Sequence, residues 1–113
     1  PYRQSRKASE DRTQFEYRYQ KAKNEFETAK TNLSSRAGSY KTQLENLITK
    51  TLPRAEKRMT LVHAIAPRDM ESLQDHRETL EAFTDLRMKV LDLRLVYEKT
   101  ITELEKVDGG IDE

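Results

Sequence analysis

Residues 68–108 constrain the fold more than any other part of the chain. Their apolar residues recur at steps of three and four with one missed turn: Leu73, Leu80, Phe83, Leu86, Val90, Leu93, Tyr97, Ile101 and Leu104. These steps place side chains along one face of an α-helix. Pro67 is typical of a helix start and Gly109-Gly110 of a helix end. A helix of about 41 residues is a rod of about 60 Å, too long for a compact bundle of this mass.

The first half of the chain predicts a second long helix. Ser9 is a candidate N-cap. The seam that follows has coiled-coil spacing and consists of Phe15, Tyr19, Ala22, Phe26, Ala29 and Leu33, continued by Ala37, Tyr40, Leu44, Leu47 and Leu52. Between Phe26 and Ala37 one step of four replaces a three, an eleven-residue repeat that relaxes left-handed supercoiling. Because Pro53 disfavours helical geometry at Leu52, we expect this arm to end at about Thr51.

The run from Ser34 to Ser39 has the weakest helix propensity in the chain, because it contains three serines and Gly38. One interpretation is a kink, which would turn the architecture into a shorter four-helix arrangement. The other, which we favour, is a continuous helix whose small residues let the facing helix approach closely.

A short elbow helix is predicted between the two arms, over residues 53–66. Ala55, Met59, Val62 and Ile65 share one face of it and would cover the open end of the hairpin. Residues 1–8 are expected to be a frayed basic terminus and 109–113 a loose acidic tail. The chain is thus predicted to be all-α, a single hairpin domain over residues 9–108. Its arms, 9–51 and 68–108, have nearly equal length, as an antiparallel hairpin of the coiled-coil type requires.

Composition supports a thin rod, because charged residues make up 36% of the chain and hydrophobic residues 35%, which limits the core it can bury. Cysteine is absent, so disulfides are excluded. No apolar run approaches a membrane span, and the basic N-terminus lacks the apolar stretch of a signal peptide. We therefore expect an intracellular protein.

Charge is distributed unevenly although the net charge is only +1. Residues 1–52 carry +5, residues 53–67 carry +2 and residues 68–113 carry −6. Individual exposed ion pairs contribute about 0–1 kcal/mol. A basic arm beside an acidic arm nevertheless favours pairing of the two arms and opposes pairing of like arms.

Several candidate sites have simpler explanations. The basic and aromatic residues between Tyr2 and Lys23 could contact nucleic acid, but Phe15 and Tyr19 are needed on the seam, so nucleic acid is not an expected partner. His63 and His76 lie on different predicted helices and lack the further ligands of a zinc site. No cofactor or metal is therefore expected. A two-helix rod offers little concavity and no nucleophile motif, so we do not expect an enzyme.

A second apolar stripe on the last helix is the sequence feature most relevant to function. Met88, Leu91 and Leu95 are offset from the seam residues, and a plain two-helix hairpin needs only one narrow seam. One explanation is that the elbow or a kinked first arm folds back over the stripe. We favour a partner helix or a second copy, giving a homodimeric four-helix bundle. The predicted function is a coiled-coil scaffold or assembly module, with contact residues Met88, Leu91, Leu95 and Val96.

An alternative function follows from residues 40–58. Tyr40, Leu44, Leu47, the Leu52-Pro53 pair and Arg58 resemble the tip of the second helix in BAR domains, which implies a curved dimer that binds anionic membrane surfaces. The similarity covers under a fifth of the chain, and a complete BAR subunit has one helix more. The residues that would contact lipid head groups are Arg54, Lys57 and Arg58.

Overall fold

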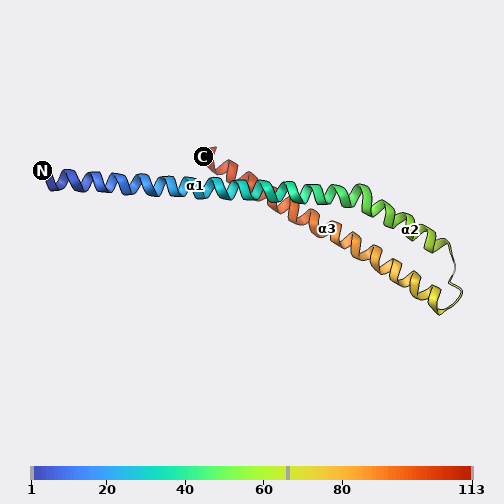
Figure 1. The fold of residues 1–113 in the computed structure, drawn as a ribbon. Helices are drawn as coiled ribbons and strands as arrows, with labels where there is room; N and C mark the ends of the chain where they lie inside the picture. Colours follow the sequence, from blue (N-terminus) through green and yellow to red (C-terminus); the bar gives the residue numbers. More distant parts are fainter. Residues whose placement is uncertain (1, 66, 113) are drawn as a thin grey trace.

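The computed structural model describes residues 2–65 and 67–112, except for the side chains of residue 2 and residues 110–112. Its elements are α1 (Tyr2–Asn46), the π-helical turn η1 (Leu47–Thr51), α2 (Leu52–Ala64) and α3 (Met70–Asp112). α1, η1 and α2 form one continuous helix that bends near η1, and α3 returns antiparallel beside it (Figure 1). The molecule measures 97 × 25 × 17 Å, which confirms the predicted elongated helical hairpin.

The hairpin is held by one seam, in which α3 packs against α1 and, toward the connection between the arms, against α2. The inward positions of α1 follow strict steps of four and three: Phe26, Lys30, Leu33, Ala37, Tyr40, Leu44 and Leu47. Those of α3 do the same, with the half-buried Ile101 beside Thr100: Ser72, His76, Thr79, Phe83, Leu86, Val90, Leu93, Tyr97, Thr100, Leu104 and Val107. Lys30 Nζ lies 2.7 Å from Asp108 Oδ1, and this pair shows the antiparallel register of the two helices. That register sets Ala37 near Thr100, and these small residues are the most buried, each 6% exposed.

Two details of the predicted seam are wrong. Ala29 is exposed and Lys30 takes its place, so the steps of α1 contain no eleven-residue irregularity after Phe26. Leu73 and Leu80 are 40% and 44% exposed. The strict heptad steps of α3 run from Leu104 back to Phe83 and continue to Thr79, His76 and Ser72. This series of positions determines which face of α3 packs inward.

The weak run from Ser34 to Ser39 stays helical, as the favoured interpretation expected. Ala37 is the one buried residue of this run, so the facing helix approaches closely at that residue alone. A Cβ added to Gly38 would meet nothing within 4 Å. The glycine is therefore not required by packing.

The π-helical turn explains how the helix passes Pro53. Leu47 and Leu52 are both half-buried although five residues separate them, and the Leu52 N–H donates to the Leu47 carbonyl. A π turn contains one residue more than an α turn, so two residues that are five positions apart lie on the same face of the helix. The prediction that the arm ends at Thr51 is wrong, because the wider turn accommodates the proline ring while Leu52 keeps helical angles of −63° and −46°.

Because α2 continues the first arm, the arms are unequal: α1 to α2 spans residues 2–64, whereas α3 spans 70–112. Residue-for-residue continuation from the Lys30–Asp108 pair places the end of α3 beside residue 26. Residues 3–25 are accordingly all exposed, and Phe26 is the first half-buried residue. The expectation of matched arms is therefore wrong. We call residues 2–25 the overhang.

The connection between the arms lies between Ala64 and Met70, and Ile65 at its start adopts an extended conformation (φ −99°, ψ 112°). α3 begins at Met70, so Pro67 lies outside the helix and not at its start, and Asp69 caps the helix. The Ser72 N–H donates to Asp69 Oδ1 at 2.8 Å, and this hydrogen bond holds the pKa of Asp69 below its ordinary value. At the other end, α3 continues through Gly109 and Gly110 without a left-handed residue, so the predicted glycine stop is wrong.

Candidate functional site

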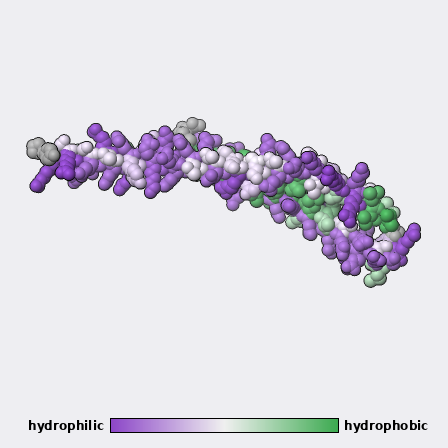
Figure 2. All heavy atoms as spheres, in the orientation of Figure 1, coloured by the Kyte–Doolittle hydropathy of each residue, from purple (hydrophilic) through white to green (hydrophobic). Residues whose placement is uncertain are grey.

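The exposed stripe on α3 is the main candidate interaction surface. Met88, Leu91 and Leu95 are 53%, 52% and 64% exposed. Met70, Leu73 and Leu80 extend the same face toward the bend, with exposures of 79%, 40% and 44%. Figure 2 shows the apolar residues gathered over the part of the rod where α2 and α3 lie, whereas the overhang is hydrophilic. We call the set Met88, Leu91, Leu95 with Leu80 and Leu73 the α3 stripe.

Val96 does not belong to this stripe. It is 42% exposed, but it follows Leu95 by one residue and therefore lies about 100° further around the helix. Its carbonyl accepts a hydrogen bond of 2.8 Å from the buried Thr100 hydroxyl. The structure thus brings together three of the four predicted contact residues. The spacing of Leu73 and Leu80 from Leu91 could have revealed the longer stripe, but both had been assigned to the seam.

Charged residues flank the α3 stripe on both edges. Helical spacing puts Asp85 and Asp92 along one edge and Arg87 and Arg94 along the other, and all four are exposed. Among the residues that the structure describes, none of the four forms an ion pair. The Arg87 guanidinium lies 5.8 Å from the Phe83 ring centroid, which orients it beside the seam. The stripe is therefore an apolar surface with one acidic and one basic edge.

The predicted basic tip lies on α2, where Arg54, Lys57 and Arg58 are exposed. Arg54 and Arg58 line a groove of about 570 Å³ between α2 and α3. Asp75 and Glu78 form its opposite wall, and Phe83 and Leu86 are among the apolar residues that line it. Two of the three predicted cations therefore share a surface with two carboxylates, which weakens the local positive field.

The structure brings the two histidines together. His63 of α2 and His76 of α3 stack with ring centroids 5.3 Å apart and planes 24° apart. His76 Nδ1 is buried and has no hydrogen-bond partner among the described residues. Sequence reasoning missed this pair because it treated the two helices separately. Over residues 2–65 and 67–112, no cluster of three or more His, Cys, Asp or Glu side chains is arranged to hold a metal ion.

The N-terminal aromatic residues are exposed, so the prediction that Phe15 and Tyr19 pack on the seam is wrong. Phe15, Tyr17 and Tyr19 are 70%, 67% and 58% exposed, because α3 ends before it reaches them. Arg6 and Glu10 form an ion pair of 3.5 Å within the helix. The predicted seam in this region therefore exists as a row of side chains without a facing helix.

Electrostatic pairing of the two arms is limited. Within the described part of the chain, Lys30–Asp108 is the one ion pair that joins α1 to α3.

No described helix combines the length and apolar character that a bilayer-spanning segment needs. The chain matches no protein-family model, no curated protein and no solved structure.

Proposed function

We propose that the chain is a non-enzymatic assembly module that binds a helix of a partner protein along the α3 stripe. The observation that carries this proposal is the exposure of Met88, Leu91 and Leu95 on the face of α3 turned away from the hairpin seam. A continuous exposed apolar surface of this kind is typical of an interaction site. An amphipathic helix in a groove or against a helix face is a common way of covering it.

The charged edges oppose an antiparallel second copy at this site. In an antiparallel helix pair, each edge faces the same edge of the partner. Setting Met88 against Leu91 of a second copy would bring Asp85 toward Asp92 and Arg87 toward Arg94. Like charges at the edges oppose association and select against wrong partners. A helix with basic residues on one edge and acidic residues on the other fits the stripe better.

The test uses a synthetic amphipathic helix with leucines at its core positions, lysines on one edge and glutamates on the other. Fluorescence anisotropy should show binding to the wild-type chain and at least about tenfold weaker binding to Leu91→Glu. Leu61→Glu is the matched control, because Leu61 is 63% exposed but lies on α2. Equal binding by all three chains would refute the proposal. A wild-type dimer that Leu91→Glu dissolves would replace partner docking with self-association at the stripe.

A second candidate function is binding to an anionic membrane surface, supported by the exposed cations Arg54, Lys57 and Arg58. Co-sedimentation with phosphatidylserine vesicles separates it from helix binding. If the tip binds lipid, changing the three cations to glutamine should abolish co-sedimentation, since each contributes about 1 kcal/mol near such a surface. Absence of co-sedimentation by the wild-type chain would exclude this function.

A further inference from the structure

Two glutamates lie on the exposed face of α3, one on each side of Met88, Leu91 and Leu95. Glu81 precedes Met88 by seven residues, and Glu98 follows Leu91 by seven residues. Residues seven positions apart lie at nearly the same angle on a helix, so both glutamates share the face of the α3 stripe. Both are exposed. The apolar centre of the stripe is therefore bounded by a carboxylate at each end.

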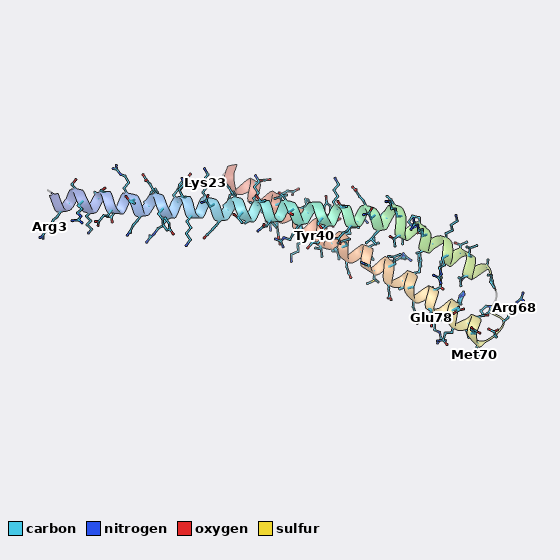
Figure 3. All side chains as sticks on the ribbon, in the orientation of Figure 1. Arg3, Lys23, Tyr40, Arg68, Met70 and Glu78 are labelled. Carbon is cyan, nitrogen blue, oxygen red and sulfur yellow. The ribbon has the colours of Figure 1, made fainter. Side chains whose placement is uncertain are left out.

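Neither glutamate has a cationic partner among the residues that the structure describes. Arg77 and Arg94 each precede one of them by four residues, a spacing at which ion pairs can form on a helix surface, but neither ion pair is formed. Figure 3, in which Met70 marks the beginning of α3, shows side chains of α3 projecting away from α1 and α2. Both carboxylates are thus open to a cation on a helix that covers the stripe.

The two glutamates oppose a second copy of this chain in either direction. In a parallel pair in register, Glu81 would meet Glu81 and Glu98 would meet Glu98. In an antiparallel pair that sets Met88 against Leu91, Glu81 of each copy would meet Glu98 of the other. Shifting this pair to set Leu91 against Leu95 would place Glu98 against Met88. Each arrangement puts like charges together or covers a carboxylate with an apolar side chain, and both oppose association.

We propose that the α3 stripe selects a partner helix that carries a lysine or arginine at each of two core positions 17 residues apart, with apolar residues between them. This inference rests on the proposed function of the stripe and specifies the chemistry of the partner. Glu81 and Glu98 are 17 positions apart, which is about 26 Å along a helix. A partner helix has the same rise, so its two cations reach both carboxylates in a parallel or an antiparallel orientation.

The two glutamates determine specificity more than they determine attraction. Burial of Met88, Leu91 and Leu95 is favourable against any apolar helix, because the hydrophobic effect is not directional. A carboxylate between two helices loses water, and a facing cation offsets this cost with charge-assisted hydrogen bonds. A helix with apolar residues at both positions leaves the carboxylates unpaired, and a helix with acidic residues adds repulsion. Charged core positions also fix the register of the two helices.

The test compares three synthetic amphipathic helices with the same leucine core and the same charged edges. They differ only at two core positions 17 residues apart, which are both lysine, both alanine or both glutamate. Fluorescence anisotropy with the wild-type chain should show that the lysine helix binds at least about tenfold more tightly than the alanine helix, and that the glutamate helix binds most weakly. Glu81→Lys together with Glu98→Lys should reverse this order.

Glu27→Lys together with Glu45→Lys is the matched control. It changes the net charge by the same amount, but both glutamates are exposed residues of α1. The control should keep the wild-type order of the three helices. If it reverses the order as strongly as the α3 variant does, the net charge of the chain accounts for the preference and the inference is overturned.

Leu91→Glu separates this inference from the proposed function. If Leu91→Glu weakens binding of all three helices while the wild-type chain binds the lysine and alanine helices equally, the stripe binds a helix but the inference about its partner fails. If Leu91→Glu binds the lysine helix as tightly as the wild type does, the proposed function fails and the inference fails with it.

Discussion

The two halves of α1 have similar sequence character but different surroundings. From Phe26 to Leu47, every turn places a side chain against α3, and Leu33 is only 8% exposed. From Arg3 to Glu25, Phe15, Tyr19 and Ala22 also follow steps of four and three, although this row is offset from the face of α1 that packs against α3, and no residue is buried. The difference arises from η1, which lets α2 continue the helix and moves the connection to α3 beyond Ala64. Heptad spacing thus predicts which side chains can pack, whereas the position of the bend decides which of them do.

The largest expected effect is the difference in unfolding free energy between truncating a residue of the seam and truncating a residue of the overhang. Leu33→Ala should lower the free energy of unfolding by about 3 kcal/mol, because it removes a buried side chain and leaves a cavity. Phe15→Ala should change it by less than about 0.5 kcal/mol in the monomer. Urea denaturation at a protein concentration too low for self-association gives both values. Equal losses would show that the overhang packs within the same chain.

A one-residue deletion in η1 should have the next largest effect. Deleting Thr49 removes the extra residue that aligns α2 with α3, so Leu52, Met59 and Val62 would rotate by about 100° away from the seam. We expect a loss of about 2 kcal/mol, the worth of roughly one buried aliphatic side chain after partial repacking. Deleting Gln20 in the overhang is the control and should leave the monomer unchanged. Thermal unfolding followed by circular dichroism would detect the contrast.

These two comparisons show how far the sequence alone could lead. The hairpin itself was predictable, because the spacing from Phe83 to Leu104 is incompatible with a strand and too long for a bundle. Arm lengths were not, because Pro53 was taken as a break, and local sequence does not reveal whether a proline is accommodated by a π turn. The stripe residues Met88, Leu91 and Leu95 were identified because they lie off the seam, whereas Leu73 and Leu80 were assigned to it.

A smaller effect is expected from replacing a glycine in the part of α1 that packs against α3. Gly38→Ala should stabilise the hairpin by about 1 kcal/mol, because alanine favours the helix and its Cβ would meet nothing within 4 Å. Gly109→Ala near the end of α3 also has open space, but terminal turns fray, so a smaller gain is expected. Chemical denaturation of both variants measures the difference. A loss of stability in Gly38→Ala would mean that the added Cβ clashes with α3.

The smallest effect should come from the cap of α3. Asp69→Ala should lower the melting temperature slightly at neutral pH, and Asp69→Asn should retain most of it because asparagine also caps helices. The folded pKa of Asp69 lies below its ordinary value of 3.8. The carboxylate therefore contributes stability above that pH, and this contribution is lost as the pH falls through the folded pKa. Melting curves at pH 7 and pH 2 should show a larger difference between wild type and Asp69→Ala at pH 7 than at pH 2.

The extra residue in η1 has a consequence for comparing this chain with homologues. A helix without that residue would pass from Leu47 to the α2 seam in regular steps, so a relative lacking the π turn should align with a single-position gap between residues 47 and 52. Such a gap, inside a continuous helix and next to a proline, would ordinarily be dismissed as an alignment error. Here such a gap would indicate a relative in which regular α-helical steps alone bring the α2 seam residues against α3.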